Sequence, residues 1–274
     1  MPYRPKLLIT RPAGQQEPFA GKCRGLGFDT VALPCIDISP VDAELPMRLI
    51  NTADLILFTS RNAVLAAHRL QPLPWPSARI EAIGNATALT LTKLGQPLTR
   101  SPTPPFTSEA FLATHKFPSS TTPLHAPLDT HIQVATVQDT HKPDDPQFRH
   151  LLLIKGEGGR DLIERSLEFM GVQISVVPVY RRSKPNNVAT TVDWASLDIV
   201  SVTSDEILRN LVDLAGITRE RLLKQLPIVV NSQRCAVLAQ ALGFTQPALV
   251  ASPAGDDGQS LQLQTWLSTF PEAN

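Results

Sequence analysis

Short runs of aliphatic and β-branched residues recur along the chain, and each is followed by a stretch with helical spacing. The runs LLLI, ISVVPV, DLILF, DIVSV and PIVV are almost continuously apolar. Such runs are typical of parallel strands that helices cover on both faces. After one of them Leu162, Ile163, Leu167 and Met170 recur at helical spacing, and Gly171 follows where a C-cap glycine is expected. The pattern predicts an α/β fold.

The chain also repeats itself, with an offset of 144 residues between the copies. The segment KLLITRPAGQQEPFAGKCRGLGFDTVALPCI, at 6–36, matches HLLLIKGEGGRDLIERSLEFMGVQISVVPVY, at 150–180. The same offset sets ADLILFTSRNAVLAAHRL, at 53–70, on LDIVSVTSDEILRNLVDL, at 197–214. A third block, IEAIGNATALTLTKLG against LPIVVNSQRCAVLAQALG, follows with an offset of 148 between Gly84 and Ser232. We therefore expect two similar parallel-sheet α/β units that arose by internal duplication.

The segment between the copies has a different character. Within PPFTSEAFLATHKF we expect a short helix capped by Ser108, whereas about 117–146 shows neither helical nor strand periodicity and is expected to form a long irregular loop. Three histidines fall there, His125, His131 and His141, without the spacing of metal ligands. The sequence thus predicts no metal site.

Composition narrows the class of protein. The 25 Lys and Arg residues balance 25 Asp and Glu, so no net field attracts nucleic acid or an anionic membrane. No apolar run reaches the roughly 18 residues of a membrane span, and MPYRPKLL lacks the apolar stretch of a secretory signal. Three widely spaced cysteines form no CxxC pattern. We expect a cytoplasmic protein whose ligand is held by local groups.

A glycine-rich turn joins a strand to a helix in LLLIKGEGGRDL. It resembles neither GxGxxG nor a P-loop, so a nucleotide is not favoured. Gly156, Gly158 and Gly159 fit an ordinary tight turn equally well. However, their N–H groups, flanked by Lys155 and Arg160, would also suit a phosphate or carboxylate. Both interpretations remain open.

Polar residues follow several of the predicted strands. The paired steps Thr59-Ser60 and Thr203-Ser204 are either helix caps or part of a ligand site, because ligands of parallel α/β sheets bind beyond the strands' carboxyl ends. The N–H and hydroxyl groups at these strand ends would donate hydrogen bonds while carrying little formal charge, which would match a ligand bearing several carboxylates. Tyr180 directly follows ISVVPV and is a candidate for either packing or chemistry. No GxSxG or HExxH motif is present.

Taken together, several segments resemble the uroporphyrinogen-III synthase family. They are TRPAGQ, DLILFTSRNAV, AIGNATALTLTKLG, GEGGRDLI followed by MGVQISVVPVYRR, and VTSDEILRNL. The resemblance covers most of the chain in the right order and fails over about Lys116 to Pro146. It implies two α/β domains joined by two extended crossings that act as a hinge. One domain, 1–36 plus 182–274, is then discontinuous, and 37–181 forms the other.

The resemblance also implies an activity. Members of the family are cofactor-independent lyases of tetrapyrrole (heme, siroheme and cobalamin) biosynthesis. They close hydroxymethylbilane to uroporphyrinogen III with inversion of ring D and loss of water. Tyr180 matches the tyrosine proposed to help the hydroxyl leave. The residues expected to bind substrate are Arg11, Thr59, Ser60, Lys155, Gly156, Gly158, Gly159, Arg160, Thr203, Ser204, Ser232 and Arg234.

The third block of the second copy departs from the family. Members often carry a Gly-x-Thr-Thr-like sequence there, where this chain has Ser232, Gln233, Arg234 and Cys235, so a threonine role does not transfer. Two alternatives to a monomeric synthase stay open: a degenerate or regulatory homologue, and a non-catalytic two-domain protein that binds a small ligand.

Overall fold

The computed structural model describes residues 3–75, 79–102, 104–115, 148–186 and 192–269. The chain divides into two compact units, one formed by Met1–Ile38 with Arg182–Asn274 and the other by Ser39–Arg181. The loop expected at about 117–146, with its three histidines, lies outside the described residues.

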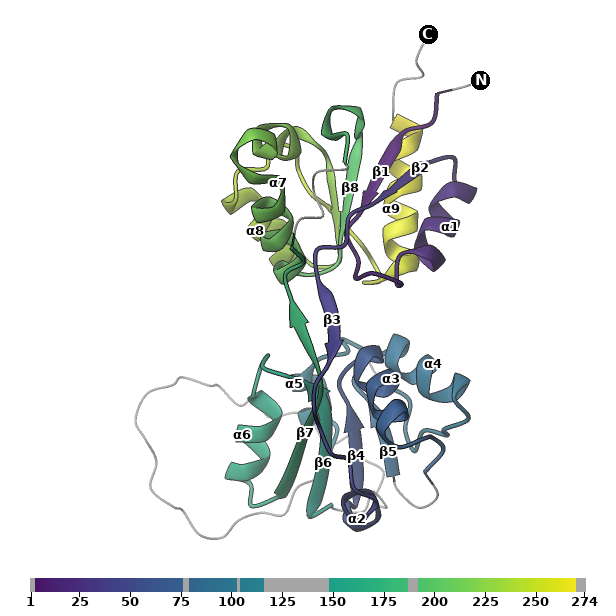
Figure 1. Ribbon diagram of the computed structural model, residues 1–274, viewed down its shortest axis with the longest axis vertical. Helices are drawn as coiled ribbons and strands as arrows, with labels where there is room; N and C mark the ends of the chain where they lie inside the picture. Colours follow the sequence, from purple (N-terminus) through teal and green to yellow (C-terminus); the bar gives the residue numbers. More distant parts are fainter. Residues whose placement is uncertain (1–2, 76–78, 103, 116–147, 187–191, 270–274) are drawn as a thin grey trace. The chain divides into compact units, whose positions relative to one another are not determined.

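Within its described residues, the first unit contains a five-stranded sheet in the order β10-β9-β8-β1-β2, with parallel pairing throughout. Figure 1 labels three of these strands, β8, β1 and β2. The strands are β1 (Lys6–Ile9), β2 (Asp29–Ala32), β8 (Ile199–Val202), β9 (Ile228–Val230) and β10 (Leu249–Val250). Helices α1 (Glu17–Gly25) and α9 (Asp256–Thr269) pack on one face, and α7 (Asp205–Gln225) and α8 (Gln233–Ala241) pack on the other, beside a 3-10 turn at Trp194–Ser196. Helix α7 is interrupted at Gly216, whose φ is 65°.

In the described part of the second unit, five strands form a sheet in the order β3-β7-β6-β4-β5. They are β3 (Asp37–Pro40), β4 (Leu55–Phe58), β5 (Arg79–Ala82), β6 (His150–Gly156) and β7 (Gln173–Ser183). The helices are α2 (Met47–Thr52), α3 (Arg61–Leu70), α4 (Asn85–Lys93), α5 (Ser108–Ala113) and α6 (Leu162–Phe169). The chain passes from one unit to the other within β3 and again within β7, which are neighbours in this sheet.

The duplication is visible in the strand order and in the register. The order β9-β8-β1-β2 in the first unit corresponds to β5-β4-β6-β7 in the second. Leu7 pairs with Ile199 in one sheet, and Leu151 pairs with Leu55 in the other, so the sequence offset of 144 exchanges the two pairs. Each unit therefore combines two strands of one copy with two strands of the other. The predicted fold class is confirmed.

Apolar side chains fill both faces of the central strands. All four residues of β4, LILF, are fully buried, as expected for a parallel strand between helices. The described helices do not reach the length and hydropathy that a membrane crossing requires.

The helix caps in the structure agree with those expected from the sequence, with one exception. Ser60 and Ser204 cap α3 and α7, each side-chain oxygen accepting a hydrogen bond from a backbone N–H three residues on. Gly171 has a φ of 76° after α6, as a C-cap glycine should. The expectation that Ser108 caps α5 is wrong. The hydroxyl of Thr107 accepts from Ala110 N, and Ser108 is already the first helical residue.

Candidate active site

The Ser and Thr residues expected at the substrate site lie where strands end and helices begin, in two separate sets, with neighbours that were not predicted. The second-unit rim contains Thr59, Ser60, Gly84, Gly156 and Tyr180, at the carboxyl ends of β4, β5, β6 and within β7. The first-unit rim contains Thr203, Ser204, Asn231 and Ser232, after β8 and β9. Both rims expose helix N-termini, whose N–H groups suit anionic ligands.

Tyr180 lies beside the cap of α3 in the second-unit rim. Its hydroxyl oxygen is 3.1 Å from Ser60 Oγ, and the residue is only 5% exposed. Ser60 Oγ also accepts a hydrogen bond of 3.1 Å from Ala63 N. One serine hydroxyl thus joins the start of a helix to the only phenol in this unit's described residues. Thr59 precedes it, with Oγ1 3.5 Å from the carbonyl oxygen of Ile154.

A bulge in the β6–β7 pairing brings Tyr180 onto Gly156. Lys155 pairs with Pro178, but the next residue, Gly156, pairs with Tyr180, so Val179 is the extra residue. The ring then lies so close to Gly156 that an added Cβ would be 2.6 Å from Tyr180 Cζ. Glu157 N closes the contact by donating to Tyr180 O at 2.8 Å. Glycine is therefore required at 156 by the tyrosine ring.

The glycine-rich turn has the expected conformation, but its cations have partners. Gly158 and Gly159 have φ angles of 66° and 80°, which favour glycine, and both are exposed. Lys155 Nζ donates to a Glu164 carboxylate oxygen and to Arg160 O, and the Arg160 guanidinium pairs with Glu109. An anion bound here would contact the turn's N–H groups, together with Lys155 and Arg160, whose positive charges are already paired with carboxylates.

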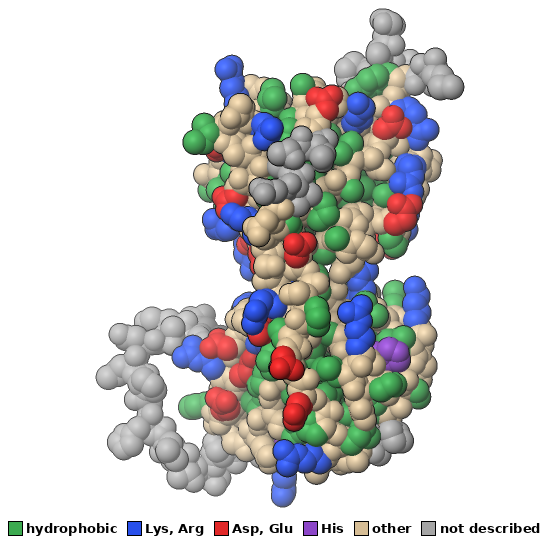
Figure 2. Space-filling model, viewed as in Figure 1, with side chains coloured by type: hydrophobic (Ala, Val, Ile, Leu, Met, Phe, Trp, Pro, Cys, Tyr) green, Lys and Arg blue, Asp and Glu red, His purple; other side chains and the backbone are tan. Residues whose placement is uncertain are grey.

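Charges around this turn are balanced in the same way. The backbone N–H of Glu109, together with the Arg160 guanidinium, holds the pKa of that carboxyl below its ordinary value. Hydrogen bonds from Arg181 lower the pKa of Glu157, so both carboxylates stay ionised at neutral pH. On the face shown in Figure 2, Lys and Arg side chains are interspersed with Asp and Glu.

In the first-unit rim the two serine hydroxyls are again helix caps. Ser204 Oγ accepts from Ile207 N at 3.3 Å, and Ser232 Oγ accepts from Cys235 N at 3.2 Å. Unlike α3, however, α7 begins with Asp205 and Glu206. These two acidic side chains make this helix start less attractive to an anion. Arg234, predicted to bind substrate, lies 2.8 Å from Asp205 and offsets one of the two charges.

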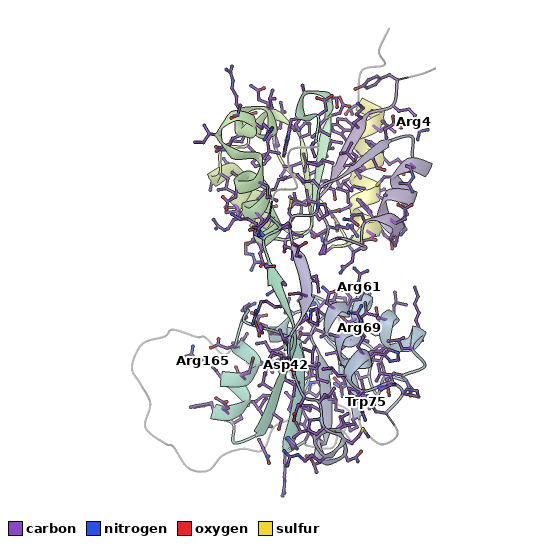
Figure 3. All side chains as sticks on the ribbon, in the orientation of Figure 1. Arg4, Asp42, Arg61, Arg69, Trp75 and Arg165 are labelled. Atoms are coloured by element: carbon purple, nitrogen blue, oxygen red, sulfur yellow. The ribbon has the colours of Figure 1, made fainter. Side chains whose placement is uncertain are left out.

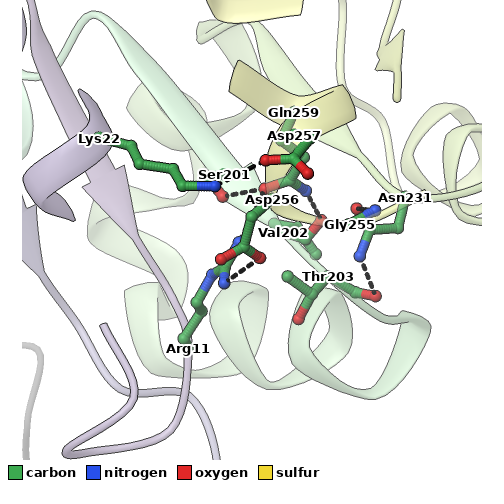
Figure 4. Close-up of polar contacts among 10 residues, drawn as sticks. All are labelled: Arg11, Lys22, Ser201, Val202, Thr203, Asn231, Gly255, Asp256, Asp257 and Gln259. Atoms are coloured by element: carbon green, nitrogen blue, oxygen red, sulfur yellow. Dashed lines mark hydrogen bonds and ion pairs between the residues drawn. The ribbon is translucent and has the colours of Figure 1, made fainter. Parts of the chain in front are cut away.

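Arg11, just after the carboxyl end of β1 in the first unit, is held in a partly buried network (Figure 4). Its Nη1 donates to Asp256 at 2.6 Å, and its guanidinium carbon lies 4.0 Å from the centre of the Phe19 ring. Gln259, on the same helix as Asp256, accepts from Ser201 Oγ at 2.8 Å. Because Arg11 is 8% exposed, its visible role is to fasten α9 against the strands.

Two further residues belong to the rims, although sequence reasoning did not single them out. Asn231 donates to Thr203 O at 3.4 Å and accepts from Gly255 N at 3.2 Å, which ties three loops together (Figure 4). Arg61 is half-buried in the first turn of α3 (Figure 3). Position alone could have identified them, because Asn231 directly follows β9 and Arg61 directly follows the Ser60 cap. Among the described residues, no His, Cys, Asp and Glu cluster suits a metal ion.

Comparison with known proteins gives a consistent result. A family model described as uroporphyrinogen-III synthase HemD matches residues 17–125 and 133–257. The interruption is thus 126–132, and the expectation that the resemblance fails over all of Lys116 to Pro146 is wrong. The uroporphyrinogen-III synthase of Salmonella typhimurium is 29% identical over 272 residues, covering 94% of this chain and 99% of the relative. The Escherichia coli enzyme of that name is 28% identical over 273 residues, with the same coverage.

Solved structures agree in fold. A mutant uroporphyrinogen III synthase from Thermus thermophilus has a TM-score of 0.57 at 16% identity, covering 96% of this chain and 98% of that one. The uroporphyrinogen-III synthetase of Helicobacter pylori has a TM-score of 0.56 at 14% identity, covering 97% and 100%. At these identities the likeness establishes the architecture.

Proposed function

The chain belongs to the uroporphyrinogen-III synthase family, and on that premise we propose that it closes hydroxymethylbilane to uroporphyrinogen III with inversion of ring D and loss of water. The observation that carries the proposal is the extent of the match: relatives with this activity in their names align with nearly their whole length. The activity is that of a lyase. Since the reaction removes water without net oxidation or reduction, it requires no redox cofactor.

Selection of the type III isomer depends mainly on the geometry in which the enzyme holds the substrate. Loss of the hydroxyl gives an azafulvene, which closes without inversion when left to itself. To form the type III isomer, the substituted carbon of ring D must attack first, giving a spiro intermediate that fragments and recloses. Holding reacting atoms in that arrangement is a task for many distributed contacts.

We assign the step that removes the hydroxyl to Tyr180. A phenol is protonated at neutral pH and can donate a proton to a departing oxygen. Its ring is fixed against Gly156, and its hydroxyl lies 3.1 Å from Ser60 Oγ. Such fixed placement supports a role as general acid, because proton donation depends first on geometry.

We assign the substrate's carboxylates chiefly to N–H and hydroxyl donors of the rims. These donors are Thr59, Thr203, Ser204 and Ser232, at strand ends and helix caps, together with the turn glycines Gly156, Gly158 and Gly159. The cationic candidates would contribute less, since each has a carboxylate partner. Those candidates are Arg11, Lys155, Arg160 and Arg234.

We place the reaction in the cytoplasm and assign it to a monomer. Cys23, Cys35 and Cys235 are all free and buried, which suits a reducing compartment.

The proposal is tested by supplying freshly generated hydroxymethylbilane, oxidising the products to porphyrins, and separating the type I and type III isomers. Type III product formed faster than spontaneous cyclisation supports it, with heat-denatured protein as the control. Type I product alone, at the spontaneous rate, contradicts it. If the bilane then still bound, the chain would be a degenerate homologue or a binding protein.

A further inference from the structure

Ser60 makes one contact more than a helix cap needs. A hydroxyl has one proton to donate and two lone pairs to accept with. One lone pair receives the N–H of Ala63 at 3.1 Å. The remaining contact of Oγ is with the hydroxyl oxygen of Tyr180, also at 3.1 Å, where either oxygen can be the donor. Ser60 can therefore cap the helix and donate to the phenol simultaneously.

The duplicated unit shows that this contact is not a consequence of capping. Ser204 lies 144 residues after Ser60 and caps α7 through the same kind of bond. The residue that corresponds to Tyr180 in the first copy is Ile36, which has no hydroxyl. Only one of these two equivalent caps thus faces a phenol.

Gly156 fixes the other side of the ring. A Cβ at this position would lie 2.6 Å from Cζ, 2.9 Å from the hydroxyl oxygen and 3.0 Å from Cε1 of Tyr180. The ring consequently rests on the glycine backbone, with the phenol oxygen held within reach of Ser60. Steric contact sets the position of this oxygen, and the serine hydroxyl is placed to set the direction of its proton.

We propose that Ser60 is a positioning residue whose O–H donates to the phenolic oxygen, Tyr180 Oη, so that the phenolic proton points away from Ser60 and toward the leaving hydroxyl of the bilane. The inference rests on the proposed function. In the step, the C–O bond breaks toward oxygen, the Tyr180 proton joins that oxygen, and water departs. Ser60 then donates a hydrogen bond to the phenolate. When the pyrrole regains aromaticity after ring closure it releases a proton, and this proton restores the phenol.

The test is a kinetic double-mutant cycle with Ser60→Ala, Tyr180→Phe and the double variant, measured as kcat and KM for bilane closure. Ser60→Ala alone should lower kcat about tenfold, the usual value of one hydrogen bond, with little change in KM. In the Tyr180→Phe background the same change should alter kcat by less than about twofold, because the hydroxyl that it orients is gone. Ser60→Thr, which retains a hydroxyl, should restore the rate.

Two further variants separate this role from folding. Thr107→Ala removes an equivalent cap from α5 in the same unit, without contact to Tyr180, and should leave kcat unchanged. Ser60→Gly removes the hydroxyl but largely retains the cap, because glycine is itself a favoured N-cap residue, so it replaces Ser60→Ala if the latter does not fold.

The possible results are distinct. Equal losses from the Ser60 change with and without the Tyr180 hydroxyl would overturn the proposal, as would a full rate in Ser60→Gly. Both results leave the synthase activity itself intact. Absence of type III product with unmodified protein would instead overturn the proposed function.

Discussion

The ring of Tyr180 rests directly on the α-carbon of Gly156, close enough that a methyl group at 156 would overlap Cζ at 2.6 Å. The relationship depends on a single register shift between Lys155 and Gly156, which sets the tyrosine opposite the glycine. It places the proposed proton donor at the carboxyl end of β6, next to the start of the glycine-rich turn. A backbone atom, rather than a side chain, therefore defines one wall of the site.

This packing predicts the effect of Gly156→Ala. The added methyl group must displace the tyrosine ring or the strand, which typically costs about 1–3 kcal/mol of unfolding free energy. The rate of bilane closure should fall by more than tenfold, roughly the effect of misplacing a catalytic group. Urea unfolding and initial rates measure the two effects. The matched control is Gly158→Ala, where nothing lies within 4 Å of an added Cβ, although its φ of 66° adds backbone strain. A Gly156→Ala protein with normal rate would show that the ring position is unimportant.

A second prediction concerns a pair of carboxylates that the duplication relates. Asp54 Oδ2 accepts from His150 N at 2.9 Å, and Asp198 Oδ2, 144 residues on, accepts from Lys6 N at 2.7 Å. Each carboxylate thus fixes the start of a neighbouring strand. Asp54→Ala and Asp198→Ala should each lower the unfolding free energy by about 1 kcal/mol or more. Asp213→Ala, which removes a surface ion pair with Lys184, should change it less. Equal effects of all three would contradict the assignment.

A third prediction concerns thiol reactivity. Burial raises the pKa of Cys23, Cys35 and Cys235 from the ordinary 9.0 to about 12. At pH 8 the folded protein should therefore react negligibly with Ellman's reagent, whereas in urea all three thiols should react as fast as free cysteine. Because the folded pKa lies above the unfolded one, the thiols' contribution to stability is complete below about pH 9 and is lost between pH 9 and 12. Rapid labelling of native protein at pH 8 would disagree with this burial.

A fourth prediction follows from distributed binding. If many N–H and hydroxyl groups share the substrate's carboxylates, Thr59→Ala and Ser204→Ala should each raise KM by no more than about tenfold. Neither should abolish turnover. Unfolding curves measure the stability of both variants. They show whether a raised KM in Ser204→Ala reflects a lost substrate contact or the loss of the cap of α7. Complete inactivity of either variant in a folded state would indicate one dominant contact instead.

The sequence was informative wherever the physics is local or periodic. Apolar runs predicted the buried parallel strands, and the offset of 144 predicted two similar units. The structure then shows the same offset in the register, where Leu7 pairs with Ile199 and Leu151 pairs with Leu55. The mixing of copies between units did not follow from periodicity, because either copy could supply either strand. Thr107 and Ser108 are adjacent and both carry a hydroxyl, so the sequence did not show which of them caps α5. The structure shows that the helix begins at Ser108 and that Thr107 is the cap.

The site was less predictable because its contacts join distant residues. Arg11 and Asp256 are 245 positions apart, so no spacing rule reveals that the guanidinium is already occupied. The bulge that sets Tyr180 on Gly156 has no compositional signature. The catalytic role of Tyr180 was predicted through the family resemblance, and its contact with Ser60 joins residues 120 positions apart.

In the proposed reaction this chain forms uroporphyrinogen III, with Tyr180 donating the proton that releases the hydroxyl. Tyr180→Phe keeps the ring against Gly156 and removes only that donor. The most direct measurement is the initial rate of bilane closure by this variant, with the isomer ratio corrected for spontaneous cyclisation. We predict a rate lower by about 10²–10⁴, the usual value of general acid catalysis, with type III still the product formed on the enzyme. An unchanged rate would contradict the claim and leave Tyr180 a packing residue, and a normal rate with mainly type I product would mean that it shapes the substrate without donating.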